Sequence, residues 1–110
     1  MTSRPLREPT FLILAALAAG PRHGYAIITE ATQISGGRVR LRAGTLYAAL
    51  DRLCAEGLVT PDREEITGGR LRRYYRLTGD GATRLAAEAD RLRVLAAAAE
   101  TRLRLAGGLT

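Results

Sequence analysis

The stretch RAGTLYAALDRLCAEGLV, residues 42–59, decides the fold of this 110-residue chain. Leu46, Leu50 and Leu53 recur at spacings of three and four residues, which is the pattern of one buried helix face. Gly57 follows in the same series and is a natural C-terminal stop for a helix. The stretch therefore predicts an amphipathic helix that packs one face against a core.

The opposite face of this helix is unusually small and smooth. Its members are Thr45, Ala48, Ala49 and Arg52. Small side chains let a helix approach base edges in the major groove, and alanine methyls can touch thymine methyls. Arg52 could then reach a guanine or a phosphate, and Arg42 stands just before the helix. The alternative is a plain amphipathic helix in which alanine serves helix propensity.

An arginine-rich hairpin is predicted directly after this helix. Gly68 and Gly69 tolerate the positive φ of a tight turn, and they place Ile66 opposite Leu71 in the pairing. Four arginines lie on the returning strand: Arg70, Arg72, Arg73 and Arg76. Such a wing can lie along a phosphate strand or enter the minor groove. A charged edge strand that prevents aggregation would show the same residues.

Two further helices are predicted before this unit. The first begins near Pro9, which suits a first helical turn, and stops at Gly20 and Pro21. The second runs over Gly24–Ile34, and a short extended piece, RVRLR, follows at residues 38–42.

The last predicted helix covers residues 80–106. At 1.5 Å per residue it would be roughly 40 Å long, which exceeds what a core of this size needs. In a heptad frame its apolar residues form a seam. One seam position holds Ala82, Ala89, Ala96 and Leu103, and the other holds Leu85, Leu92, Ala99 and Ala106. A long helix with such a seam needs a partner.

The order of elements defines the expected fold class. It is mainly α with a small β-hairpin: a winged helix-turn-helix plus a long C-terminal dimerisation helix. We expect the DNA-binding domain at residues 1–78, the dimerisation helix at 79–106 and a tail at 107–110.

Composition limits the partners. The chain carries a net charge of +6, a pI of about 10.7 and 17 basic residues, all arginine. This balance indicates a polyanionic partner, either nucleic acid or an anionic membrane surface. The long helix has no aromatic anchors in its seam and its charges are mixed, so a membrane is disfavoured. The apolar run at residues 11–19 is too short to span a bilayer, and we expect a cytoplasmic protein.

The sequence offers little for catalysis or metal binding. Cys54 is the single cysteine, so no intrachain disulfide can form, and no cysteine and histidine cluster suits a metal or cofactor. No paired carboxylates, P-loop or nucleophile elbow is present, and we predict a non-enzyme. His23 is expected to cap or pack, with catalysis or metal binding as the alternative. Cys54 is expected to be structural and buried, with a redox switch as its alternative.

Three blocks of the chain together resemble the PadR family of bacterial transcriptional regulators, in its short form. They are GPRHGYAI at residues 20–27, GTLYAALDRLCAEGLV at 44–59 and RRYYRLTGDG at 72–81, and the resemblance covers residues 8–85. It implies a homodimer, built through the first and last helices, that binds operator DNA and usually represses. In such proteins a small molecule often releases the DNA.

The resemblance also assigns residues. Thr45 and Tyr47 match the GTLY block, whose hydroxyls commonly meet phosphates, and Tyr25 matches the tyrosine of HGY, with a structural role as its alternative. The full set expected to bind DNA is Tyr25, Arg42, Thr45, Tyr47, Ala48, Ala49, Arg52, Arg70, Arg72 and Arg73. The set expected in dimerisation is Leu14, Leu85, Ala89, Leu92, Ala96, Ala99 and Leu103.

Two points stay open at this stage. Some members stack flat drugs on tryptophan at the dimer interface, but this chain has no tryptophan and one phenylalanine, Phe11, so the existence of an effector is undetermined. The rival function is a winged-helix module that binds a protein through its long helix, or a DNA binder without a dedicated operator.

Overall fold

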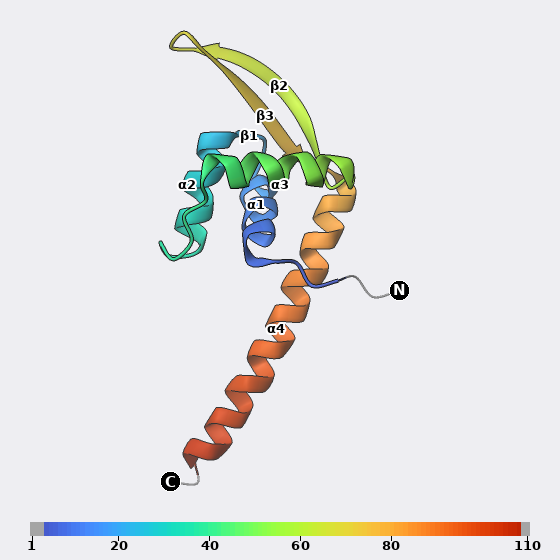
Figure 1. Ribbon diagram of the computed structural model, residues 1–110. Helices are drawn as coiled ribbons and strands as arrows, with labels where there is room; N and C mark the ends of the chain where they lie inside the picture. The colour runs from blue at the N-terminus through green and yellow to red at the C-terminus, as the bar shows by residue number, and fades with distance from the viewer. Residues whose placement is uncertain (1–3, 109–110) are drawn as a thin grey trace.

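The computed structural model describes residues 4–108. Its elements are α1 (Glu8–Ala18), β1 (Arg22–His23), α2 (Gly24–Ile34), α3 (Ala43–Ala55), β2 (Val59–Thr67), β3 (Arg70–Leu77) and α4 (Gly79–Gly108). The fold is the expected one, mostly helical with a small antiparallel sheet and a long C-terminal helix (Figure 1).

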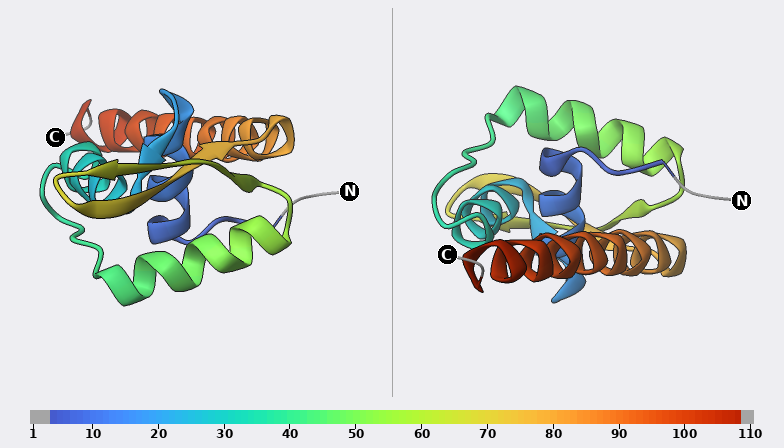
Figure 2. Two further views of the ribbon diagram at one scale, coloured as in Figure 1. Left: turned by 90° about the horizontal axis from the view of Figure 1, so that it is seen from above. Right: turned by 90° about the horizontal axis from the view of Figure 1, so that it is seen from below.

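Helix α1 is the centre of the core. It lies between α3 and α4 (Figure 2), and it buries residues around most of its circumference. Ile13 and Leu14 are completely buried there, as are Ile27 of α2 and Leu46 and Leu50 of α3. A helix that is apolar on nearly all sides must be covered on all sides, which explains why α1 is the central element.

The core corrects one expected dimerisation residue. Leu14 has an exposed fraction of 0%. Its side chain is enclosed by its own chain and cannot reach a partner subunit. The spacing of apolar residues in α1 correctly indicated a buried stripe, but it did not show that the chain covers this stripe by itself.

The hairpin has the predicted turn and register near its tip. Gly68 and Gly69 adopt φ of 59° and 77°, the left-handed conformation of a two-residue turn that matches strand twist. Ile66 pairs with Leu71 as predicted. Further down, the register shifts between Pro61 and Glu64, where β2 contains a bulge that the sequence did not indicate.

Gly57 stops helix α3 as predicted, with a φ of 77°, whereas the sheet differs from the expected two-stranded wing. Helix α3 ends at Ala55, and Leu58 donates its backbone N–H to the Leu53 carbonyl at 3.0 Å in the closing turn. Residues 58 and 59 therefore leave the helix, and Val59 begins β2. The sheet also has a third strand, because β1 pairs with β3 through Arg22 and Tyr75. A two-residue strand has no periodicity by which a sequence could reveal it.

Helix α4 gives the molecule its elongated shape. Its 30 residues correspond to about 45 Å, and the molecule measures 63 × 33 × 21 Å. Its first turns pack against α1, where Leu85 contacts the core, and the rest extends away from the body (Figure 1). The helix continues through Gly108, so residues 107 and 108 of the expected tail are helical, and residues 109 and 110 lie outside the described residues.

Candidate nucleic-acid interface

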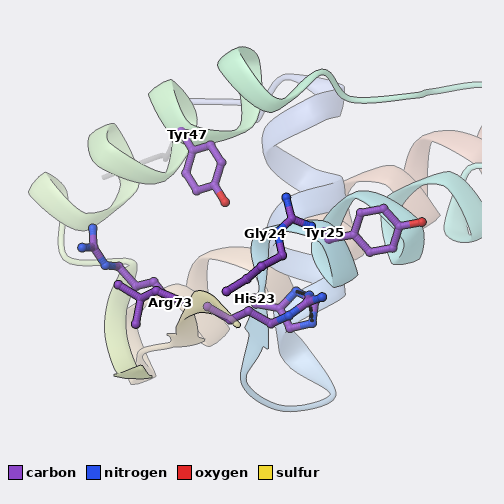
Figure 3. A pocket seen from close by; sticks show the side chains of 8 residues that line it. His23, Gly24, Tyr25, Tyr47 and Arg73 are labelled. Carbon is purple, nitrogen blue, oxygen red and sulfur yellow. Dashed lines mark hydrogen bonds between the residues drawn. The ribbon is translucent and has the colours of Figure 1, made fainter. Parts of the chain in front are cut away.

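A cleft of about 320 Å³ lies between the start of α2, helix α3 and the hairpin (Figure 3). We call it the wing cleft. Its lining residues are His23, Gly24, Tyr25, Tyr47, Arg70, Leu71, Arg72 and Arg73. Five of the ten residues expected to bind DNA are therefore brought together here: Tyr25, Tyr47, Arg70, Arg72 and Arg73.

Tyr47 and Gly24 meet at the floor of the wing cleft. In Figure 3 the Tyr47 ring points toward Gly24. A Cβ atom at position 24 would lie 2.3 Å from the Tyr47 hydroxyl oxygen, so only glycine allows this approach. The Tyr25 ring points away from Tyr47 and is 73% exposed, which excludes a packing role. Neither hydroxyl has a hydrogen-bond partner among residues 4–108, so both can donate to a phosphate.

His23 connects helix α2 to the hairpin. Its Nδ1 accepts the backbone N–H of Ala26 at 3.2 Å, which makes it the predicted cap of α2. The Arg72 guanidinium nitrogen NH1 lies 3.3 Å from the same Nδ1, and the Tyr74 ring packs edge-on with a centroid distance of 5.2 Å. Burial and the Arg72 charge lower the pKa of His23, while Glu65 opposes them. The contact therefore favours a neutral imidazole.

The hairpin arginines differ in their partners. Arg73 forms an ion pair with Glu64 at 3.1 Å, and Arg76 forms one with Asp62 at 3.5 Å. These exposed pairs are weak in water and can exchange for phosphate contacts. Within residues 4–108, Arg70 makes no ion pair. The predicted turn places Glu65 opposite Arg72, and the structure has this register, but the Glu65 carboxylate bonds Arg63 instead.

Arg72 and Arg63 are more constrained than the other hairpin arginines. Arg72 has a buried Nε with no hydrogen-bond partner in the described part of the chain. Arg63 donates to Glu65 at 2.6 Å and lies 4.0 Å from the centroid of the Tyr74 ring. The hydrogen bond from Arg63 lowers the pKa of Glu65, which therefore stays charged at neutral pH.

The exposed face of helix α3 differs from the predicted one. Ala49 is only 9% exposed and packs in the core, so it cannot reach DNA in this arrangement. Asp51, by contrast, is exposed, although it was not among the expected site residues. Alanine suits either side of a helix, so its position alone could not define the face. The exposed residues of α3 and its N-cap that belong to the expected set are Arg42, Thr45, Tyr47, Ala48 and Arg52.

Arg52 has a partner that the sequence did not reveal. Its guanidinium donates to the Thr10 hydroxyl of α1 at 3.0 Å. This contact ties the C-terminal half of α3 to the start of α1. The structure therefore gives Arg52 a role in joining two helices, and reading a base would require this hydrogen bond to break.

A second hollow lies between α1, the end of α2 and α4. We call it the α1/α4 groove, and its volume is about 380 Å³. Its apolar lining includes Leu6, Phe11, Leu12, Ile34 and Leu92. The buried Glu88 carboxylate closes one side and is paired with Arg91 at 2.5 Å.

Beyond this groove, α4 leaves its predicted seam uncovered. Of the seam residues expected in dimerisation, Leu85 contacts the core, whereas Leu103 is 70% exposed. The remaining members are also exposed: Ala89, Leu92, Ala96 and Ala99.

Neither Cys54 nor a metal site adds to this interface within the described residues. The Cys54 thiol is half-buried, and burial together with the Asp51 charge raises its pKa, which opposes formation of a reactive thiolate. Within residues 4–108, no group of three or more His, Cys, Asp or Glu side chains could hold a metal ion. No helix of that same segment is long and apolar enough to cross a bilayer.

Three helices, a small sheet and a basic cleft between α3 and the wing define a DNA-binding protein of the winged helix-turn-helix class. The sequence model of the transcriptional regulator PadR-like family matches residues 13–87. The chain belongs to this family of transcriptional regulators, as its sequence blocks predicted.

Individual relatives agree with this assignment. A PadR family transcription regulator from Clostridium difficile superposes with a TM-score of 0.72 at 26% identity, over 88% of this chain and 99% of that one. Bacillus subtilis PadR in complex with operator DNA superposes with a TM-score of 0.63 at 28% identity, over 73% and 45%. An uncharacterised 37.1 kDa protein in a transposon of Streptomyces fradiae is 46% identical over 82 residues. That match covers 74% of this chain and only 22% of the relative's length.

Proposed function

We propose that this regulator is a homodimeric repressor that binds a specific operator in the cytoplasm. Helix α3 enters the major groove, the hairpin reaches the adjacent minor groove, and the phosphate strand between the two grooves runs through the wing cleft. The observation that carries this proposal is the wing cleft itself, because the exposed residues Tyr25 and Tyr47 and three arginines line it between α3 and the hairpin. Bacillus subtilis PadR, a structural relative, has been solved in complex with operator DNA, which supports DNA as the partner.

The proposed domains follow from this arrangement. Residues 1–78 form the DNA-binding unit, and residues 79–106 of α4 form the dimerisation unit. The uncovered seam of α4 supports dimerisation, because exposed leucines such as Leu92 and Leu103 would stabilise an assembly in which a partner covers them. A two-fold dimer uses the same patch on both chains. The seam and the α1/α4 groove of one chain therefore contact the seam and the groove of its partner.

In the proposed mechanism, a small molecule that binds in the α1/α4 groove releases the DNA. The α1/α4 groove is large enough for a small ligand and is partly apolar. The same groove adjoins the seam at Leu92, so a ligand bound there would act on the dimer.

Selection of bound sequences from a random duplex library, at physiological salt, tests the operator. We expect a palindrome whose half-sites lie about one helical turn or a multiple apart, because the dimer carries two copies of α3. Enrichment of duplexes without any motif, with binding that only follows salt, would contradict a dedicated operator and favour a general DNA binder. Absence of DNA binding altogether would favour the protein-interaction module.

Repression needs a separate measurement. A reporter gene placed behind the selected operator should lose expression when the protein is produced and regain it with a variant that does not bind DNA. Higher expression with the protein than without it would make the protein an activator and overturn the repressor part of the proposal.

A further inference from the structure

Two large apolar side chains stand exposed at the tip of the hairpin. Ile66 is 79% exposed and Leu71 is 61% exposed. They are direct cross-strand partners, one pair away from the turn at Gly68 and Gly69. At the base of the same hairpin Tyr75 is buried in the core. The tip therefore keeps its apolar surface in water in the free protein.

Hairpin stability does not account for this pair. Cross-strand apolar pairs stabilise a sheet by covering each other, typically by a few tenths of a kcal/mol to about 1 kcal/mol. Here most of both side chains remains uncovered. An exposed apolar patch on β2, which is an edge strand of the sheet, also invites aggregation. Such a patch is typical of a surface that a partner covers.

The surroundings of the tip indicate a polyanionic partner. Leu71 itself lines the wing cleft, so the apolar tip is continuous with the surface proposed to bind DNA. Arg70 and Arg72 flank Leu71 in the strand. A second copy of the same tip would bring arginines against arginines, and this repulsion disfavours pairing between hairpins.

The shape of the tip fits a narrow groove. The turn consists of two glycines, so the end of the ribbon is only as wide as its backbone. The minor groove of B-DNA is about 6 Å wide and is walled by the apolar faces of deoxyribose rings. Proteins that enter it often insert Leu or Ile side chains against or between base steps, which bends the duplex.

We propose that Ile66 and Leu71 form an apolar wedge that enters the minor groove beside the segment read by α3. This inference rests on the DNA binding proposed above. The wedge packs against deoxyribose faces and opens a base step, while Arg70 contacts the phosphate at the groove edge. Steps that deform easily, such as TA and CA/TG, are then preferred under the wing although no hydrogen bond reads their bases.

The experiment compares wild type with the double variant Ile66→Thr/Leu71→Thr on the selected operator. Threonine keeps a β-branched side chain and therefore suits the strand, but it removes most of the apolar surface. We expect an affinity loss of about tenfold or more, because the two side chains lose their burial on binding. The slope of log K against log salt should not change, because no phosphate contact is lost. Leu71→Met, which keeps the apolar volume, should bind like wild type.

Two readouts locate the wedge on the DNA. Replacing guanine by inosine under the wing removes only the amino group in the minor groove. The substitution should therefore change the operator affinity of wild type and leave that of the double variant unchanged. Energy transfer between dyes at the operator ends should report a smaller bend with the double variant than with wild type.

The outcomes separate the wedge from the proposed function. If wild type binds no operator, the proposed function fails and the wedge fails with it. If wild type binds and the double variant binds with equal affinity and equal bend, the wedge alone is wrong. The wedge is also overturned if the double variant binds more weakly only because its thermal unfolding midpoint has dropped. It is overturned as well if wild type binds anionic vesicles as tightly as DNA.

Discussion

His23 fixes the start of α2 and contacts Arg72 at the same time, and both contacts need a neutral ring. Protonation of Nδ1 would remove the acceptor for the Ala26 N–H and place a second positive charge beside Arg72. The pKa of His23 in the folded protein is lowered, so the unfolded chain binds the extra proton first as pH falls. Stability is therefore complete above the ordinary histidine pKa of about 6.5 and declines as pH falls toward the lower folded pKa.

Urea unfolding of wild type and His23→Asn between pH 5 and pH 8 measures this effect. Asparagine keeps a capping oxygen but does not titrate. At pH values below 6.5 we expect the urea midpoint of wild type to decrease more than that of His23→Asn, whose midpoint should depend less on pH. Parallel profiles for the two proteins would show that His23 does not carry the pH dependence.

Gly24 is predicted to act on DNA through Tyr47. Gly24→Ala places a methyl group where the Tyr47 hydroxyl now lies, and the ring must turn aside. If that hydroxyl donates to a phosphate, Gly24→Ala and Tyr47→Phe should each weaken operator binding by about tenfold. The double variant should be no weaker than either single variant, because one contact is lost in all three. Additive losses in a gel-shift titration would show that Gly24 and Tyr47 act separately.

At the scale of the element, the hairpin carries a competition between carboxylates and phosphates. In the proposed binding mode, Arg73 exchanges its ion pair with Glu64 for a phosphate contact. Arg73→Ala should therefore weaken binding to operator and random DNA alike and reduce the salt slope by about 0.9. Glu64→Gln should strengthen both by a few fold, because it frees Arg73 and removes a charge that repels phosphate. Affinity titrations at four salt concentrations measure both effects, and an Arg73→Ala loss confined to the operator would contradict them.

The hairpin also shows how far a sequence can predict an interface. The glycine turn fixes the register near the tip, so the pairing of Glu64 with Arg73 follows from counting back from Gly68. The bulge between Pro61 and Glu64 has no such signal, and it brings Asp62 within reach of Arg76. Contacts set by a regular register could be predicted, whereas contacts set by an irregularity could not.

The helices show the same limit in another form. Leucine spacing placed the core side of α3 correctly, because a leucine on a folded helix usually marks the buried face. Alanine gives no such information, so Ala49 was assigned to the wrong side. The hydrogen bond from Arg52 to Thr10 joins residues 42 positions apart, and no local pattern encodes a contact of that range.

At the scale of the whole molecule, the two parts of α4 have different surroundings. Its first turns belong to the core of the DNA-binding unit, while its distal turns contact little of their own chain (Figure 1). Leu103 and Leu105 are exposed to similar extents, 70% and 65%, but helix geometry places them about 160° apart around the axis. Only Leu103 lies in the seam that continues from Leu92 in the α1/α4 groove.

This pair of leucines gives a matched test of the dimer. Leu103→Glu should convert the dimer to a monomer in sedimentation experiments, because a charge in an apolar interface is costly to bury. Leu105→Glu carries the same charge on the opposite face and should stay dimeric. Operator affinity should fall by about a hundredfold or more for Leu103→Glu alone. Two separate monomers must then bind the two half-sites, and the high effective concentration of a linked second subunit is lost. Each half-site should retain its weak affinity, since α3 and the hairpin stay intact. If Leu105→Glu dissociates the protein and Leu103→Glu does not, the partner covers the other face of α4, and the two copies of α3 must be spaced differently on DNA.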